Sequence, residues 1–232
     1  LEQIRKDFVS NVSHELKTPL TSIKSYTETL LDGMYEDHEL TERFLGVVNS
    51  EADRMTRLVR DLLQLSSFDN NKVKWTLEYN NFVELINQTM TKLQLTAHNK
   101  NQRFIFKSDV DELTSYFDFD RMEQVLNNII SNAIKYTEEN GEIEIGLRHE
   151  DSNAVIYVQD TGIGIPENDI PRIFERFYRV DKARSRELGG TGLGLAIAAE
   201  ILEAHLGTIN ITSEVNKGTR VEIKIPIQNN LT

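Results

Sequence analysis

The sequence contains no cysteine, so it has neither a disulfide framework nor a thiolate metal site. It also lacks a run of 18 apolar residues, and its first residues do not form a signal peptide. Basic residues are outnumbered, because 26 Lys and Arg stand against 37 Asp and Glu, for a net charge of −11. An acidic surface argues against nucleic acid as a partner. We therefore expect a fragment without direct membrane contact.

The 232 residues are 39% hydrophobic, enough for one large core or two modest ones. The chain begins at Leu1 within a helical pattern and without a methionine. This beginning predicts a piece of a longer protein, whose upstream part could hold a membrane anchor.

Two long helices are predicted first. Apolar residues at helical spacing run from Leu1 to Leu30, and Gly33 is expected to end this helix before a polar turn at residues 35–39. The second helix carries a heptad pattern, formed by Leu45, Val48, Ala52, Met55, Val59 and Leu62. One hairpin cannot bury two long apolar stripes, so we predict that two copies pair into a homodimeric four-helix bundle. The alternative is that the stripe packs on the rest of the same chain.

The polar face of the second helix is predicted to be solvated. Asp53, Arg57 and Asp61 follow one another at intervals of four residues, which favours exposed ion pairs of small energetic value.

The pattern changes after a polar linker at residues 68–74, which separates a domain at residues 1–67 from one at residues 75–232. The second domain mixes helices and strands, and its hairpins predict a largely antiparallel sheet with helices on one face, an α+β two-layer sandwich. The predicted helices are 82–98, a helix that begins at Asp120, 170–177 and 195–205; the predicted strands are 75–77, 103–107, 115–119, 142–148, 154–159, 208–213 and 219–226.

His14 is the first candidate for chemistry. It lies within FVSNVSHELKTPL, residues 8–20, and is followed by Glu15, Thr18 and Pro19. A helical histidine beside a carboxylate suits phosphoryl transfer to an imidazole. Alone it is a weak signal.

The segment NNIISNAIKY, residues 127–136, places three polar side chains on one helix face, those of Asn128, Asn132 and Lys135. Amide oxygens are suitable ligands for Mg²⁺, and a lysine supplies a positive charge for phosphate. The alternative for these residues alone is a solvated polar stripe.

Two further motifs follow. In DTGIGI, residues 160–165, the glycines allow a ligand to approach the backbone, and a buried Asp160 would accept a hydrogen bond from an exocyclic amine such as that of adenine. A capped tight turn is the simpler alternative. In FERFYR, residues 174–179, Arg179 is the predicted phosphate contact, whereas the aromatic residues more often pack at a hinge than against a base.

The last motif is GGTGLGL, residues 189–195, where a glycine-rich loop opens a helix and its amides form an anion site. It is neither a P-loop nor a dinucleotide fingerprint, because no Gly-Lys-Ser/Thr and no βαβ unit accompanies it. The stretch from Pro166 to Gly194 is long enough to predict a functional lid. Together the four motifs indicate an ATP site.

These residues resemble sensor histidine kinases of two-component systems, and the resemblance covers essentially the whole chain. Residues 8–20 are similar to the H box, 127–136 to the N box, 160–165 to the G1 box, 174–179 to the F box and 189–197 to the G2 box. The H box and the lid resemble the WalK/VicK branch. The resemblance implies a dimerisation and histidine-phosphotransfer domain, then an ATP-binding domain of the histidine kinase, gyrase and Hsp90 type, in the cytoplasmic region of a membrane-anchored bacterial sensor.

The resemblance also implies roles by position. His14 would be the phosphoacceptor, Glu15 would orient its ring, and Thr18 would serve in dephosphorylation of a response regulator's receiver domain. Asn132, helped by Asn128, would bind Mg²⁺. The nucleotide would be bound by Lys135, Tyr136, Asp160, Gly162, Gly164, Arg179, Gly190, Thr191, Gly192, Leu193 and Gly194.

Two rival functions remain open from the sequence. An ATPase of the gyrase or Hsp90 type shares the second domain but does not explain the first 65 residues. A dimeric scaffold could bind ATP without transferring phosphate. The other histidines, His38, His98, His149 and His205, are predicted to be surface or structural residues.

Overall fold

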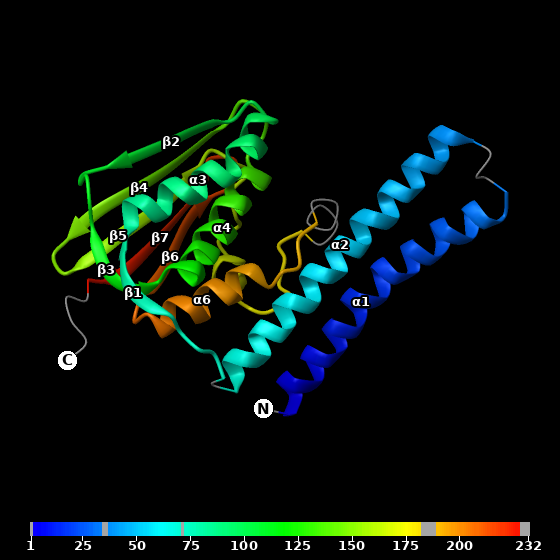
Figure 1. The fold of residues 1–232 in the computed structure, drawn as a ribbon, viewed down its shortest axis with the longest axis horizontal. Helices are drawn as coiled ribbons and strands as arrows, with labels where there is room; N and C mark the ends of the chain where they lie inside the picture. The colour runs from blue at the N-terminus through cyan, green and yellow to red at the C-terminus, as the bar shows by residue number, and fades with distance from the viewer. Residues whose placement is uncertain (1, 34–36, 71, 182–188, 228–232) are drawn as a thin grey trace.

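The computed structural model describes residues 2–33, 37–70, 72–181 and 189–227. Within these residues, a long helical hairpin precedes an α/β domain that packs against the hairpin's open end (Figure 1). Residues 34–36 of the expected turn and 182–188 of the expected lid lie outside the described residues. None of the described helices is long and apolar enough to span a membrane.

The hairpin consists of α1 (Glu2–Leu31) and α2 (His38–Asp69), as the two apolar stripes predicted. The Asp37 carboxylate caps α2 by accepting a hydrogen bond from the Leu40 backbone N–H at 3.0 Å. Helix α1 continues through Pro19, whose side chain is buried. Helix α2 ends at Asp69, so its last two residues belong to the segment 68–74 that was expected to be a linker.

The heptad stripe of α2 is only partly covered within one chain. Leu45 and Val59 are 52% and 44% exposed, whereas Leu58 and Leu65, on the neighbouring face, are 2% and 0% exposed. Leu58 and Leu65 belong to the same buried cluster as the core of the α/β domain. Of the stripe itself, Leu62 packs against that cluster. The alternative of packing within the chain therefore holds for the C-terminal end of the stripe, whereas Leu45 and Val59 remain open for a second copy.

The α/β domain contains two sheets. A five-stranded sheet has the order β2-β4-β5-β7-β6, in which only the β2/β4 pair is parallel, and a small antiparallel sheet pairs β1 with β3. This confirms the largely antiparallel sheet and both predicted hairpins. The strands are β1 (Leu77–Asn81), β2 (Arg103–Ser108), β3 (Thr114–Asp118), β4 (Glu142–Glu150), β5 (Asn153–Asp160), β6 (Thr208–Glu214) and β7 (Gly218–Pro226).

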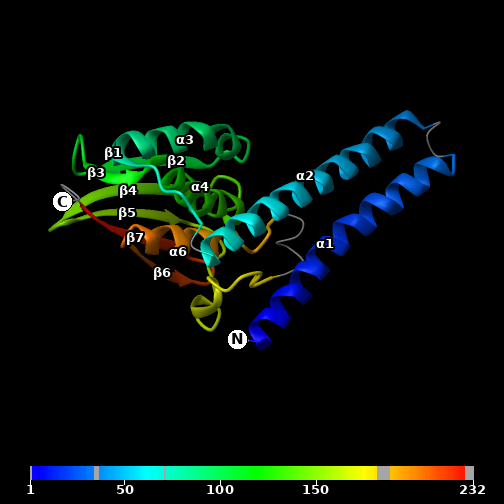
Figure 2. The same ribbon diagram turned by 60° about the horizontal axis from the view of Figure 1, so that its bottom comes forward.

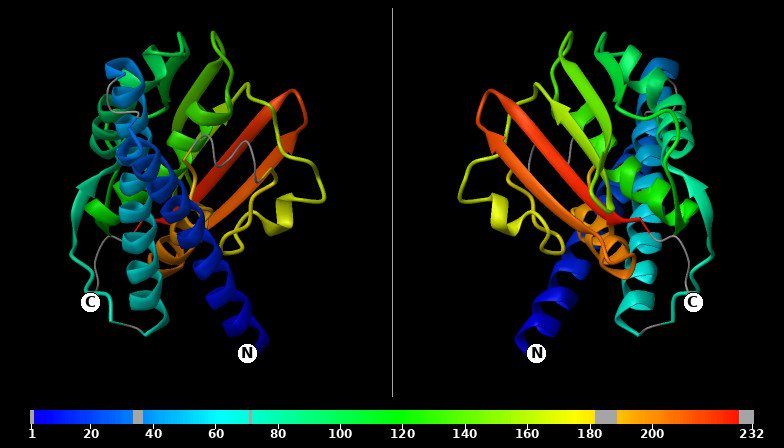
Figure 3. Two further views of the ribbon diagram at one scale, coloured as in Figure 1. Left: turned by 90° about the vertical axis from the view of Figure 1, so that its right-hand side faces the viewer. Right: turned by 90° about the vertical axis from the view of Figure 1, so that its left-hand side faces the viewer.

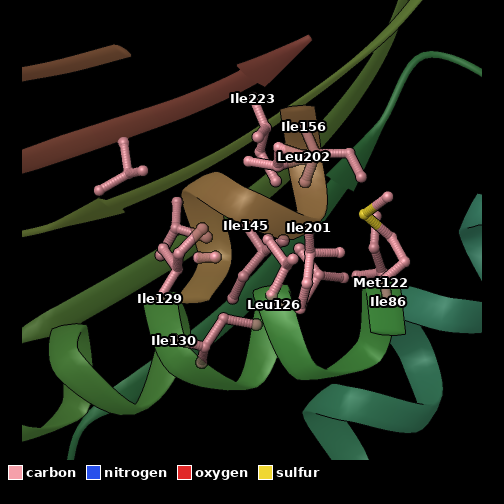
Figure 4. Close-up of a cluster of buried hydrophobic side chains, with 14 of the residues drawn as sticks. Ile86, Met122, Leu126, Ile129, Ile130, Ile145, Ile156, Ile201, Leu202 and Ile223 are labelled. Atoms are coloured by element: carbon pink, nitrogen blue, oxygen red, sulfur yellow. The ribbon is translucent and has the colours of Figure 1, made fainter. Parts of the chain in front are cut away.

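Three helices cover one face of the large sheet, which confirms the α+β sandwich (Figures 2 and 3). They are α3 (Phe82–His98), α4 (Phe119–Tyr136) and α6 (Gly194–Ala204). Figure 4 shows the core between the layers, where Leu126 and Ile130 of α4 and Ile201 of α6 lie near Ile145 and Ile156 of the sheet; all five are fully buried. Helix α4 is thereby fixed against the sheet with its polar face turned away.

Three local predictions were wrong. The strand expected at residues 75–77 is observed as β1, at Leu77–Asn81, where it pairs with β3. Helix α4 begins at Phe119 rather than Asp120, because the Asp118 carboxylate caps it and accepts from the Arg121 N–H at 3.1 Å. The helix expected at residues 170–177 is reduced to a 3₁₀ turn, η2 (Ile170–Arg172). Phe177 has φ of +67°, a left-handed backbone conformation that interrupts helical structure.

Candidate active site

His14 lies on α1 with its side chain exposed. The Thr18 hydroxyl, one turn later, donates to the His14 carbonyl oxygen at 3.2 Å. An exposed imidazole on a rigid helix is accessible to a phosphoryl donor from outside the hairpin.

Glu15 points from α1 toward α2 and is held by two arginines. Its Oε2 atom accepts from Arg54 of α2 at 2.9 Å and from Arg179 of the α/β domain at 2.8 Å. The exposed fraction of the Glu15 side chain is 12%, and those of the two arginines are 7% and 4%. The predicted phosphate-binding arginine therefore contacts the residue next to His14.

Arg179 has unused hydrogen-bonding capacity. Its Nε and Nη1 atoms are buried and have no hydrogen-bond partner among the described residues. A buried, unsatisfied guanidinium donor is costly. Each of these two nitrogens shares an edge of the guanidinium with Nη2, and such an edge matches two oxygens of a phosphate. These donors make Arg179 well suited to bind a phosphate.

Lys135, near the end of α4, lies within the same group of cations. Burial, and then three nearby arginine charges, lower its pKa from 10.5 to about 8; the arginines are Arg179, Arg54 and Arg57. A phosphate bound there would offset this repulsion and would raise the pKa of Lys135 again.

We therefore expect ADP binding to take up protons near pH 8. About half of the Lys135 side chains are neutral at that pH in the free protein, so binding should take up about half a proton, and about a tenth at pH 7. Calorimetric titration in two buffers of different ionisation enthalpy measures this number. Lys135→Met should abolish the uptake and Lys107→Met, on a distant strand, should retain it; equal uptake in all three proteins would contradict the assignment.

The two asparagines of α4 take different positions. The Asn128 side-chain amide donates to the Gly194 carbonyl oxygen at 2.9 Å and so joins α4 to the first turn of α6. Asn132, one turn later on the same face, is half-buried. The described residues contain no group of three or more His, Cys, Asp or Glu side chains suited to a metal. Amide oxygens together with nucleotide phosphates fit Mg²⁺, which retains several waters.

Asp160, at the end of β5, is 8% exposed and accepts two backbone hydrogen bonds. Both reach Oδ1, from the Gly162 N–H at 2.8 Å and the Thr219 N–H at 3.2 Å. Burial raises the pKa of this carboxyl above its usual value. Oδ2 is left to accept from a ligand, as an adenine amine requires. A Cβ at Gly162 would lie 2.6 Å from the Tyr136 carbonyl oxygen, so glycine is needed for this approach.

The glycine-rich loop before α6 is attached to the hairpin. The Thr191 hydroxyl donates to Oδ2 of Asp61 at 3.0 Å, and the Leu193 N–H donates back to that hydroxyl at 3.3 Å. Burial raises the pKa of Asp61. The prediction that Asp61 is solvated was therefore wrong. Leu193 is fully buried, and Gly192 has φ of +74°.

Within FERFYR, Phe177 and Arg176 contact the helical hairpin, whereas the Tyr178 hydroxyl donates to Asp169 of its own domain at 2.6 Å. The rings of Phe177 and Phe8 lie 5.8 Å apart, and Arg176 forms two hydrogen bonds with the Asp69 carboxylate, at 2.7 and 2.8 Å. These contacts favour the hinge-packing alternative over base stacking.

Several residues of the site were not identified from the sequence. Thr219 supports Asp160, and Arg54 binds Glu15. Lys100 donates through Nζ to the carbonyl oxygens of Ile134 and Thr137 at 2.9 and 3.0 Å, and thus holds the end of α4 that carries Lys135. The predicted turn around Gly218 is the one sequence signal that lies near Thr219. Arg54 and Lys100 lie far in sequence from the motifs, so no local pattern indicated them.

Two family models match the chain. Residues 4–71 match the His Kinase A (phospho-acceptor) domain, and residues 117–229 match the histidine kinase-, DNA gyrase B- and HSP90-like ATPase domain. The sensor histidine kinase WalK of Bacillus subtilis is 45% identical over 97% of this chain. The chain spans 37% of that relative's length.

Solved structures agree with the sequence comparisons. The catalytic domain of histidine kinase ThkA is 31% identical with a TM-score of 0.59, over 66% of this chain and 96% of that one. ThkA in complex with response regulator protein TrrA is 25% identical with a TM-score of 0.80, over 97% of this chain and 63% of that one. The chain therefore belongs to the sensor histidine kinases, and its similarity to WalK confirms the predicted branch.

Proposed function

We propose that the chain transfers the γ-phosphoryl group of ATP to His14 and then to an aspartate of a response regulator. The observation that supports this most directly is the 2.8 Å ion pair between Arg179 and Glu15. It brings a guanidinium beside the residue that follows the exposed histidine, and two donors of that guanidinium have no partner in the part of the chain that the structure describes. A phosphate bound to those donors would lie close to the acceptor.

Each of the predicted site residues has a separate role in the transfer. A neutral nitrogen of His14 attacks the γ-phosphorus, and Glu15 accepts the proton of the other ring nitrogen, which stabilises the developing positive charge. Lys135 and Arg179 bind phosphate oxygens, and Asp160 accepts from the adenine amine. Asn132 and Asn128 would hold Mg²⁺, which supplies further charge neutralisation to the triphosphate. Gly162, Gly164, Gly190, Gly192 and Gly194 give the pocket its backbone shape, and Tyr136, Thr191 and Leu193 line it.

The proposal is tested by incubation with γ-labelled ATP and Mg²⁺. Incorporated label should be lost in acid and stable in base, as a phosphoramidate is. Addition of a receiver domain should then move the label into an acid-stable, base-labile acyl phosphate. ATP hydrolysis without labelling would favour a gyrase- or Hsp90-type ATPase. Nucleotide binding with neither reaction would favour the scaffold.

We also propose that the same site dephosphorylates the response regulator. Thr18 lies one turn after His14, and its hydroxyl is positioned by the His14 carbonyl oxygen, where it could orient a water molecule. Thr18→Ala should reduce the dephosphorylation rate at least about tenfold and change autophosphorylation less than about twofold. Loss of labelled phosphate from a phosphorylated receiver measures this rate. Thr21→Ala, which removes a similar hydroxyl one turn on, is the control, and an equal loss in both variants would contradict the role of Thr18.

We propose that the chain is a homodimer joined along the hairpin. The exposed apolar side chains of α1 and α2 support it, among them Leu20 at 56%, Leu45 at 52% and Val59 at 44%. Val59→Glu should shift the molecule toward monomer and raise the dimer dissociation constant at least about tenfold, because a charge would be buried. Light scattering across a dilution series measures this. Leu95→Glu, at a 70% exposed position on α3, should leave the dimer intact; if both variants behave alike, the interface lies elsewhere.

The remaining organisation is also a proposal. We infer domains at residues 1–67 and 75–232 with a linker at 68–74, in the cytoplasmic region of a membrane-anchored sensor. The two family matches, 4–71 and 117–229, support the division. Separate expression of 75–232 tests it, since an independent domain should bind ADP as the full chain does. Membrane fractionation of the whole protein tests the anchor.

A further inference from the structure

Arg54 is a buried charge in the middle of α2. Its side chain is 7% exposed, at a position where α2 faces α1. A buried guanidinium is stable only when it is paired and hydrogen-bonded. Arg54 meets this need with Glu15 at 2.9 Å and, from the preceding turn of its own helix, with Glu51 at 3.5 Å.

The two arginines that bind Glu15 differ in where they are attached. Arg54 belongs to the same hairpin as Glu15, and Glu51 fixes its other end. Arg179 belongs to the α/β domain, and its Nε and Nη1 atoms remain unpartnered among the described residues. A phosphate that binds two nitrogens on one edge of this guanidinium competes with Glu15, because each such edge includes Nη2, the nitrogen that donates to Glu15.

The local charge favours this exchange. Arg54, Arg57, Lys135 and Arg179 are close enough that the three arginines repel the lysine, whereas Glu15 and Glu51 are the carboxylates bound to Arg54. An incoming triphosphate would therefore be attracted to Arg179 and Lys135. Glu15 would then keep its hydrogen bond to Arg54.

We propose that Arg54 is a positioning residue for phosphoryl transfer, which holds the Glu15 carboxylate beside His14 while Arg179 binds the phosphate. The inference rests on the proposed function. In the step, one ring nitrogen of His14 forms a bond to the γ-phosphorus, and the bond from that phosphorus to the β,γ-bridging oxygen breaks. ADP leaves with the electron pair. The proton of the other ring nitrogen passes to Glu15, whose orientation depends on Arg54.

This role differs in its consequences from a purely structural one. Loss of a hairpin contact alone would lower stability and affect every property of the folded protein alike. Loss of a positioning contact lowers kcat far more than it weakens ATP binding, because Arg54 contacts Glu15 directly and reaches the nucleotide site only through its charge.

The experiment uses the full chain with Arg54→Met, Arg54→Lys and the control Arg43→Met, which removes an exposed arginine from the same helix. Initial rates of labelling give kcat and KM for ATP, and calorimetry gives the dissociation constant of ADP. Arg54→Met should lower kcat at least about tenfold, with KM and the ADP constant within about twofold of wild type. Arg54→Lys should recover part of the loss, since lysine keeps the charge without the fork. Arg43→Met should match wild type.

A double-mutant cycle tests whether Arg54 affects the transfer rate through Glu15. If Arg54 acts through Glu15, Arg54→Met should have no further effect on kcat in a Glu15→Gln background. Additive losses, a kcat within twofold of wild type in Arg54→Met, or a parallel rise in KM would overturn the inference. If Arg54→Met unfolds at the assay temperature, Arg54→Gln is judged by the same criteria. Failure of the wild type to become labelled would instead overturn the proposed function.

Discussion

Asp160→Asn is expected to weaken ATP binding about 10- to 100-fold and to reduce discrimination against ITP. The two backbone N–H groups that bind Oδ1 would retain the side-chain oxygen of the asparagine and turn its NH₂ group toward the ligand. That NH₂ would face the adenine amine, and a buried donor left without an acceptor costs about 1–3 kcal/mol. Hypoxanthine carries an oxygen at the same position and would accept from it.

Competition titrations of ATP and ITP against a fluorescent nucleotide measure both effects. Asp151→Asn, in the exposed turn between β4 and β5, is the matched control and should behave as wild type. An unchanged preference for ATP in Asp160→Asn would show that Asp160 does not contact the base.

Gly164→Ala should lower the melting temperature by about 5–15 °C and abolish detectable nucleotide binding. Gly164 has φ of +70°, and a Cβ there would overlap the backbone carbonyl of Glu214 in β6. The left-handed backbone costs about 1–2 kcal/mol for a residue with a side chain, and the overlap adds about 1–3 kcal/mol. Because the carbonyl belongs to a strand, the loop after Asp160 would have to move.

Gly46→Ala provides the opposite case. Gly46 lies within α2, and nothing lies within 4 Å of a Cβ added there. Alanine should stabilise the helix by about 0.5–1 kcal/mol. Thermal unfolding and ADP titration of both variants test the comparison, and equal melting temperatures would be inconsistent with the close approach at Gly164.

The sequence predicted what local patterns determine. The periodicity of Phe82 to His98 gave both ends of α3 as they are observed, and turn residues gave the β4–β5 and β6–β7 hairpins. The polar face of α4 followed from the spacing of Asn128, Asn132 and Lys135. The same reasoning failed at residues 170–177. There Phe177 has a left-handed backbone conformation, and its N–H donates to the Gly192 carbonyl oxygen instead of to a carbonyl of the preceding helical turn.

Contacts between distant segments could not be read from local patterns. Arg54 lies 39 residues from Glu15, and Glu15 lies 164 residues from Arg179. On α2 alone, Arg54 is one charge among several, and only the packing of the α/β domain against the hairpin distinguishes it. Asp61 was predicted to be solvated for the same reason. Its hydrogen-bond donor, Thr191, lies 130 residues away in the sequence.

The central claim, that His14 accepts phosphate from ATP bound in the α/β domain, is tested most directly by comparing His14→Gln with His38→Gln. His38 is also followed by a glutamate in the sequence, but it lies at the start of α2 with its side chain 89% exposed and near Glu42. With γ-labelled ATP, His14→Gln should carry no acid-labile label while it binds ADP as wild type does, and His38→Gln should be labelled fully. Label retained in His14→Gln would contradict the account.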